Sequence, residues 1–168
     1  AEQERLRNMF AEKTTKPGAD EHGLVAWWAF DESKDSPVVL DYSGHRLGGS
    51  LIKTGRKPGV DGDAMECDGG CAVIAADPLL SPSQAMTVEC WVKTDKPAQN
   101  SAWIVNRVYA QGDSGYRLGL TDGKPTFGIP QAGWDYHLTA ADALPVGRWV
   151  HLAGTFDGKT IRIYMDGK

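Results

Sequence analysis

The tripeptide Asp-Gly-Lys occurs three times in the second half of the chain, at residues 122–124, 157–159 and 166–168. An Asp-Gly pair between alternating segments favours a two-residue hairpin turn, because glycine accepts the positive φ angle that such a turn requires. The first two copies have a candidate strand on each side, so they predict antiparallel hairpins. The third copy stands at the last residues of the sequence, and we therefore expect a domain that lacks its final strands.

Short segments rich in β-branched and aromatic residues follow one another from residue 24 to residue 165, without a convincing helical period. The clearest alternation runs over 86–93, where the apolar even-numbered residues should share one face and Glu89 and Trp91 the other. The candidate strands are 24–30, 72–75, 86–93, 102–107, 116–121, 126–129, 136–139, 149–156 and 160–165. So many short strands between Gly, Pro and Asp turns predict an all-β fold, an antiparallel sandwich or jelly roll.

The N-terminal residues differ from the rest. Residues 1–13 place Leu6, Met9 and Phe10 at helical spacing, which predicts a short amphipathic helix. Residues 14–21 contain a Lys-Pro-Gly break and read as a linker. We therefore divide the chain into an arm and linker over 1–22 and one domain over 23–168.

The charge of the chain excludes some classes of partner. Its 18 Lys and Arg residues against 22 Asp and Glu give a net charge of −4, and no basic cluster offers a phosphate-binding stripe. Nucleic acid is therefore excluded as a partner.

No apolar run approaches the roughly 18 residues of a membrane helix. The first residues lack the apolar segment of a signal peptide, so we expect any export signal to have been removed or to lie outside this sequence.

Several segments together resemble the laminin-G-like members of the concanavalin A-like jelly-roll superfamily. The matching segments are 23–32, 41–45 with Gly48-Gly49, 86–93, 144–158 and 161–167, of which 144–158 matches most strongly. The resemblance implies a concanavalin A-like jelly roll of the bacterial type, attached to a secreted or cell-surface protein, and hence an extracellular or cell-envelope location. Such modules continue with further strands and a closing segment beside the first strand. We therefore expect either that another polypeptide segment completes the sheet or that this fragment is not the functional unit.

The resemblance also implies a structural calcium ion near the loop 41–49. Asp41 opens this glycine-containing loop and Asp31 precedes it, so these two aspartates are the candidate metal ligands. The alternative is a turn in which Asp41 accepts hydrogen bonds from its own backbone. No Cys/His pattern suggests zinc.

Carbohydrate binding requires exposed aromatic rings beside polar groups, because sugar rings stack on flat apolar faces. Trp134 lies in a glycine-containing connection and is the best candidate, unless it anchors that loop on the core. We also expect Trp103, Tyr109 and Tyr116 to share a sheet face. The candidate carbohydrate-binding residues are Trp103, Arg107, Tyr109, Trp134, Tyr136 and His137.

Two enzymatic alternatives stay open. Glycoside hydrolysis needs paired carboxylates, but Glu66 and Asp68 run into two glycines, as at a strand end and turn, and Glu89 is a lone carboxylate beside Trp91. A polysaccharide lyase needs a base and an arginine. For that chemistry the sequence offers Tyr136 and His137 with Arg107, Tyr109 and Arg117, whereas we expect His151 to be structural.

The three cysteines do not form a disulfide scaffold. Cys67 and Cys71 flank Asp-Gly-Gly, a spacing that permits a bridge across a tight hairpin; the alternative is two small buried neighbours. Cys90 lies within a strand and is expected to be a buried free thiol.

These observations favour a non-catalytic module that binds a polysaccharide or another glycan as part of a larger secreted or cell-surface protein. One alternative is a structural or protein-interaction domain attached to an enzyme. The other is a lyase or glycoside hydrolase built on a jelly roll.

Overall fold

A computed structural model describes residues 23–82, 84–108, 115–129 and 137–168. Within these ranges the secondary structure is β, apart from one short 3₁₀ turn, and every strand pair is antiparallel. The all-β prediction is confirmed, and the architecture is consistent with a jelly-roll sandwich. The predicted N-terminal helix lies outside the described residues. The chain forms two compact units that divide between residues 81 and 82, and each is described by itself. The prediction of one domain over 23–168 stays a prediction.

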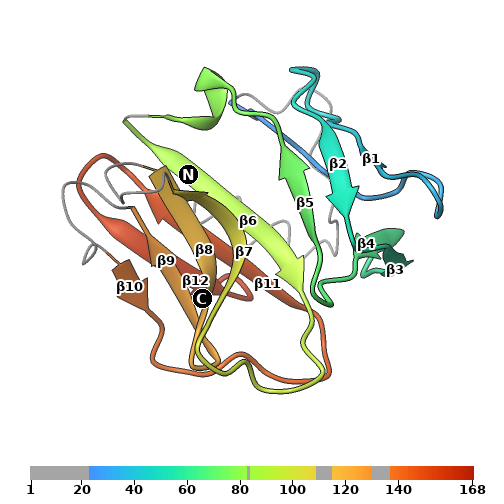
Figure 1. The fold of residues 1–168 in the computed structure, drawn as a ribbon. Helices are drawn as coiled ribbons and strands as arrows, with labels where there is room; N and C mark the ends of the chain where they lie inside the picture. The colour runs from blue at the N-terminus through green and yellow to red at the C-terminus, as the bar shows by residue number, and fades with distance from the viewer. Residues whose placement is uncertain (1–22, 83, 109–114, 130–136) are drawn as a thin grey trace. The chain divides into compact units, whose positions relative to one another are not determined.

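The C-terminal unit, residues 82–168, contains two antiparallel sheets (Figure 1). The four-stranded sheet has the order β10 (His137–Thr139), β9 (Lys124–Gly128), β8 (Gly115–Thr121), β7 (Ser101–Val108). The three-stranded sheet has the order β12 (Ile161–Met165), β11 (Val150–Phe156), β6 (Met86–Val92). We call this unit the sandwich.

The core of the sandwich is built from one face of each sheet. Leu118 and Phe127 of the four-stranded sheet and Val150 and Leu152 of β11 are fully buried in one cluster. The even-numbered residues of β6, from 86 to 92, pack against that cluster, so the alternation predicted for this strand is confirmed. Cys90 is among them and is partly buried, in line with its predicted place within a strand.

Asp-Gly turns connect neighbouring strands of the sandwich, as predicted. Asp122 (φ 49°) and Gly123 (φ 77°) both have positive φ between β8 and β9, which is the two-residue hairpin turn expected of this pair. Asp166 (φ 51°) and Gly167 (φ 74°) have the same conformation.

The Asp157-Gly158 turn differs from the prediction. Phe156 pairs with Ile161, so the connection has four residues, and only Gly158 has positive φ. The Asp157 carboxylate accepts hydrogen bonds from the backbone N–H groups of Lys159 and Thr160, which stabilise this longer loop.

The N-terminal unit, described from residue 23 to residue 81, has short strands. One sheet has the order β1 (Val38–Val39), β2 (Gly49–Ile52), β5 (Cys71–Ile74); the other pairs β3 (Arg56–Pro58) with β4 (Asp63–Met65). A 3₁₀ turn, η1 (Pro78–Leu80), follows β5. The sequence predicted β5 but missed β1 to β4. Strands β1, β3 and β4 have only two or three residues, which is too short to show an alternation, and β2 begins with Gly49-Ser50.

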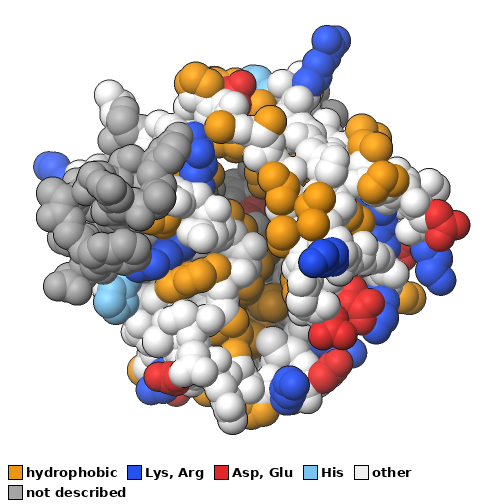
Figure 2. Space-filling view, in the orientation of Figure 1, with side chains coloured by type: hydrophobic (Ala, Val, Ile, Leu, Met, Phe, Trp, Pro, Cys, Tyr) orange, Lys and Arg blue, Asp and Glu red, His pale blue; other side chains and the backbone are white. Residues whose placement is uncertain are grey.

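The three-stranded sheet of this unit has one buried and one exposed face. Val39 and Leu51 are buried, whereas Val38, Ile52 and Val73 are 43%, 45% and 54% exposed. Hydrophobic side chains gather accordingly over β1, β2 and β5 (Figure 2). This sheet therefore presents an apolar surface to its surroundings.

Residues 24–30 do not form the predicted strand. The backbone N–H of Trp27 donates to the Asp41 carboxylate (2.9 Å), and its C=O accepts from the N–H of Tyr42 (2.9 Å). The C=O of Val25 accepts from the Ser43 hydroxyl. These backbone groups are satisfied by a loop and by side chains, so the aromatic segment does not need a strand ladder.

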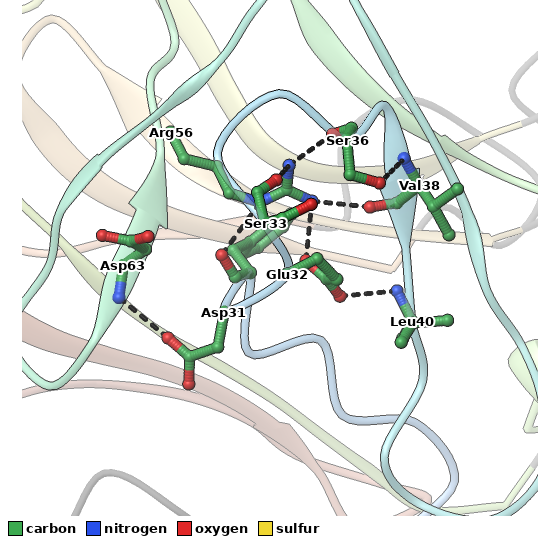
Figure 3. A network of polar contacts seen from close by, with 9 residues as sticks. Asp31, Glu32, Ser33, Ser36, Val38, Leu40, Arg56 and Asp63 are labelled. Atoms are coloured by element: carbon green, nitrogen blue, oxygen red, sulfur yellow. Dashed lines mark hydrogen bonds and ion pairs between the residues drawn. The ribbon is translucent and has the colours of Figure 1, made fainter.

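A buried arginine organises the segment that follows (Figure 3). The Arg56 side chain is fully buried, and its Nη2 lies 2.6 Å from Oε2 of Glu32, which is 6% exposed. The same guanidinium donates to the backbone C=O groups of Phe30, Ser36 and Val38. Glu32 also accepts from the N–H of Leu40. The buried guanidinium and its carboxylate partner therefore hold the backbone between residues 30 and 40 in place.

Candidate functional site

The face of the four-stranded sheet that points away from the core carries a polar and aromatic surface. Residues directly opposite each other on neighbouring strands share a face, so the register separates this outward face from the face that contains Leu118 and Phe127. The outward positions are Ser101, Trp103, Asn106, Val108, Gly115, Arg117, Gly119, Thr121, Lys124, Thr126, Gly128, His137 and Thr139.

Trp103 and Arg117 form the centre of this outward face. The Arg117 guanidinium carbon lies 4.4 Å from the centroid of the Trp103 ring, the geometry of a cation–π contact. Trp103 pairs with Gly119 of β8. A Cβ built on Gly119 would lie 2.9 Å from Cε3 of Trp103, so the missing side chain is what lets the indole lie across the neighbouring strand. The arginine and the indole thus hold each other in place.

Polar side chains surround this pair. His137, Gly128, Arg117 and Asn106 follow one another across the sheet as register partners. In the neighbouring row the hydroxyl oxygens of Thr126 and Thr139 lie 3.1 Å apart. His137, Thr139 and Asn106 are exposed, whereas Trp103 and Arg117 are half-buried. A flat aromatic ring beside hydrogen-bonding groups of both kinds is suited to a ligand with both an apolar face and hydroxyl groups.

The predicted carbohydrate-binding residues do not all gather on this face. Trp103 and His137 lie on it. Tyr116 is buried in the core, so the expectation that it shares a face with Trp103 is wrong. Burial raises the pKa of Tyr116, and the nearby charge of Arg107 lowers it in part. Arg107 is the register partner of Tyr116 and therefore belongs to the core-facing side. Tyr109, Trp134 and Tyr136 lie outside the described residues.

The residues proposed for a lyase are also divided. Arg107 and Arg117 belong to opposite faces of the sheet. His137 and Arg117 share the outward face, with Gly128 between them in the same row. The sequence offers Arg117 only for this lyase group, because its stacking on Trp103 depends on strand register, which no short sequence motif reports.

The candidate glycosidase carboxylate, Glu89, lies on the other sheet of the sandwich, on the same strand as Trp91 and near His151 of β11. Oε2 of Glu89 lies 3.8 Å from Nε2 of His151, and the rings of Trp91 and His151 are 5.3 Å apart. Glu89 and Trp91 share a face, as predicted. His151 is only 3% exposed, which agrees with a structural role. Among the described outward positions of β6, β11 and β12, no second Asp or Glu accompanies Glu89. Glycosidase activity stays a prediction.

The Glu66–Asp68 segment is a strand end and turn, as the sequence indicated. Strand β4 ends at Met65, and the N–H of Glu66 donates to the C=O of Gly55. The Glu66 carboxylate forms an ion pair with Lys57.

Asp41 is the hydrogen-bond centre of its loop. Its Oδ1 accepts from the N–H groups of Trp27 and Ser43, and its Oδ2 accepts from the Ser43 hydroxyl and the Leu47 N–H. Partial burial alone would raise the pKa of Asp41, but these hydrogen bonds outweigh it and hold the pKa below its usual value. The predicted turn alternative is therefore confirmed.

The predicted calcium ligands do not fit a metal in this arrangement. Asp31 accepts from the backbone N–H of Asp63 (2.8 Å), and both oxygens of Asp41 already accept two donors each. No three His, Cys, Asp or Glu side chains of the described ranges gather closely enough to hold a metal ion. A calcium ion at Asp31 and Asp41 stays a prediction, and it would require Asp41 to release its backbone donors.

Cys67 and Cys71 are free thiols in the structure, and both residues are exposed. They are therefore neither bridged here nor the buried neighbours of the alternative interpretation. Partial desolvation of the sulfur, followed by the nearby Cys71, raises the pKa of the Cys67 thiol.

Within the described ranges the structure contains no helix with the length and apolar character that a membrane span requires.

Comparisons with known proteins give the family. No curated protein matches the chain in sequence. A family model described as the concanavalin A-like lectin/glucanases superfamily matches residues 68–168, which is more than half of the chain. These residues include all of the sandwich, and the chain belongs to the concanavalin A-like lectin/glucanases superfamily.

Proposed function

We propose that the chain is a non-catalytic recognition module of a secreted or cell-surface protein, and that it binds glycans on the outward face of the four-stranded sheet. The observation that carries this proposal is the half-buried Trp103, which Gly119 and Arg117 hold in a fixed orientation. An aromatic ring with a fixed orientation loses little conformational entropy when a sugar ring stacks on it.

The neighbouring side chains support the same function. Asn106 and His137 are exposed on the same row of the sheet, and the amide and the imidazole each offer donors and acceptors for sugar hydroxyls. Membership of a superfamily that contains lectins and glucanases agrees with a glycan ligand, although a fold does not determine a function by itself.

Affinity electrophoresis through gels that contain plant, algal or host polysaccharides tests the proposal. We expect at least one polysaccharide to retard the chain, and Trp103→Ala to reduce the retardation at least tenfold. Asn106→Ala, an exposed position, should reduce binding without unfolding, as followed by far-UV circular dichroism. The matched control is Tyr42→Ala, which removes an exposed aromatic residue of the N-terminal unit. Equal retardation of the wild type and both outward-face variants on every polysaccharide would exclude this site.

The exposed apolar face of β1, β2 and β5 favours a second candidate, a protein-interaction role. Contiguous apolar surface of this kind often marks a contact with another polypeptide. If no polysaccharide binds, substitution of Val73 and Ile52 by Thr should lower self-association or partner capture by the chain.

The enzymatic alternative predicts release of reducing or unsaturated sugar, which Glu89→Gln or His137→Ala would abolish.

A further inference from the structure

We infer that Cys67 and Cys71 form a redox site, at which a small disulfide oxidises the two thiols to one intramolecular bridge. The site lies in the N-terminal unit and is independent of the proposed glycan binding. The two thiols stand at the ends of a five-residue segment, Cys-Asp-Gly-Gly-Cys, that leads from β4 to β5. Both cysteines are exposed and reduced in the structure, so an oxidant in solution has access to either sulfur.

The fold holds both ends of this segment. At its first end, the N–H of Glu66 donates to the C=O of Gly55 (3.0 Å), and the C=O of Glu66 accepts from the Thr54 hydroxyl. At its second end, Cys71 is the register partner of Ile52 in the β2–β5 pair. The residues that hold the two ends are neighbours in the sequence, so both cysteines are brought to the end of β2.

Two glycines let the chain turn back between these ends. Gly69 has a left-handed φ of 76°, which glycine adopts without strain. A Cβ on Gly70 would lie 2.3 Å from the C=O of Lys53, so the returning backbone passes this close to the end of β2 because the residue is glycine. The nearness of the thiols also shows in the pKa of Cys67, which desolvation raises most and the charge of Cys71 raises further. A bridge requires Cα atoms within about 7 Å of each other, and a tight reversal of five residues is suited to provide this distance.

The oxidation consists of two thiol–disulfide exchanges. One cysteine thiolate first attacks a sulfur of the small disulfide RSSR, whose S–S bond breaks, and the released thiolate takes up the proton that the cysteine lost. The thiolate of the other cysteine then attacks the protein sulfur of the mixed disulfide and expels the second RS group, which takes up the second proton. Two protein thiols and one RSSR thus become one protein disulfide and two RSH, so the protein loses two electrons and RSSR gains them.

Peptide mapping at a controlled redox potential tests the inference. The full chain is equilibrated with mixtures of oxidised and reduced glutathione, quenched with acid, alkylated in denaturant and digested with a protease that cleaves before aspartate. Cleavage before Asp63, Asp68, Asp77 and Asp95 places the three cysteines on separate peptides. We expect peptides 63–67 and 68–76 to appear linked, and alkylation of their two thiols to be lost together and restored by dithiothreitol. Cys90, on peptide 77–94, should remain outside that link.

The same equilibrium in urea measures what the fold contributes. Because the fold holds both ends of the segment, we expect the ratio of bridged to reduced protein, at one glutathione ratio, to be at least about tenfold higher in the folded chain than in the unfolded chain. Gly70→Ala should lower this ratio, because the added Cβ meets the backbone of Lys53. The matched control is Gly55→Ala, whose Cβ has no neighbour within 4 Å and which should keep the ratio unchanged. Far-UV circular dichroism checks that both variants fold.

A cysteine variant identifies the intermediate. Cys67→Ser removes the second attacking thiol, so a glutathione adduct should accumulate on Cys71 in place of the bridge.

Two outcomes would overturn the inference. Separate glutathione adducts on Cys67 and Cys71, or a link to Cys90, without the expected linked peptides at any glutathione ratio, would show that the two sulfurs do not meet. A ratio of bridged to reduced protein that is no higher in the folded chain than in urea would show that the fold does not arrange the pair. Neither result bears on glycan binding, which the polysaccharide gels test separately.

Discussion

The ring of Phe127 on β9 lies directly against Gly154 on β11, so that a Cβ built on this glycine would be 2.2 Å from Cδ2 of the ring. Gly154 occupies a core-facing position between Leu152 and Phe156. The absence of a side chain there is what allows a large aromatic residue from the opposite sheet to fill the centre of the sandwich core.

We therefore expect Gly154→Ala to destabilise the sandwich by about 1–3 kcal/mol, because an added methyl group overpacks a dense core. Urea denaturation followed by tryptophan fluorescence measures the change. Gly55→Ala is the control, since a Cβ there has no neighbour within 4 Å and the backbone is not left-handed. An unchanged urea midpoint for Gly154→Ala would contradict the close packing of the Phe127 ring on Gly154.

Removal of Arg56 should release residues 30–40. Arg56→Met leaves the nearly buried Glu32 carboxylate without its cation and four backbone carbonyls without their donor. Loss of one partner of a buried pair typically costs about 3–5 kcal/mol. Hydrogen exchange measured by mass spectrometry should then be faster at Leu40, whose N–H donates to Glu32.

The exposed ion pair between Arg148 and Asp166 provides the control for that experiment. Exposed pairs contribute about 0–1 kcal/mol, so Arg148→Met should leave exchange within residues 30–40 unchanged. Unaltered protection of Leu40 in Arg56→Met would contradict the organising role of the arginine.

Because of Asp41, the stability of its loop should fall at low pH. Its pKa is lowered in the folded state, so the carboxylate stabilises the fold above its unfolded-state pKa of about 3.9, and that contribution is lost as the pH falls through the lower folded value. Asp41→Asn removes the acceptors for the Ser43 hydroxyl and the Leu47 N–H. It should therefore lower stability at neutral pH by about 1–3 kcal/mol.

The measurement is the unfolding free energy between pH 5 and pH 2.5. The decline over this interval should be smaller in Asp41→Asn than in the wild type. Asp142→Asn, an exposed aspartate of the sandwich, should retain the full decline. Identical acid profiles for the wild type and Asp41→Asn would contradict the lowered pKa.

The Cys67 thiol should react slowly with alkylating agents. The thiolate is the reactive form, and the raised pKa leaves less of it at a given pH. Alkylation by iodoacetamide, followed by peptide mass spectrometry, should therefore reach its half-maximal rate above the usual thiol pKa of about 8.5.

Cys71→Ser supplies the comparison, because removal of the neighbouring thiolate should lower the pKa of Cys67 and speed its alkylation at pH 8.5. If Cys67 and Cys71 resist alkylation completely until a reductant is added, the two thiols are bridged in the protein under those conditions.

Sequence periodicity predicted strand β6, because one of its faces is buried in the core and the other points away from it. In β6 one face packs on the core and the other carries Glu89 and Trp91, so alternation was sufficient to assign both faces. The composition of the segments and the turns between them located β7 to β12 to within one or two residues. Turn chemistry predicted the positive φ angles of Asp122 and Gly123, because the sequence preference is local.

Features that depend on distant residues were not predictable in this way. The aromatic segment 24–30 has strand composition, but Asp41 and Ser43 satisfy its backbone from a loop. The face of Trp103 depends on its register with β8 and on the bulge between Trp103 and Val105, which shifts the alternation of β7. No local signal marks Arg56 as buried, because its partners come from residues 18 to 26 positions earlier.

Gly119 offers a way to recognise related modules that keep the same surface. A Cβ at this position would meet the C=O of Ala102 at 2.4 Å and the indole of Trp103 at 2.9 Å, so both the close approach of the two strands and the position of the indole depend on glycine here. A relative with tryptophan but a larger residue opposite has to tilt its indole away from the sheet. In an alignment, the paired presence of these two residues would therefore sort members of the family with this surface from members that share only the fold.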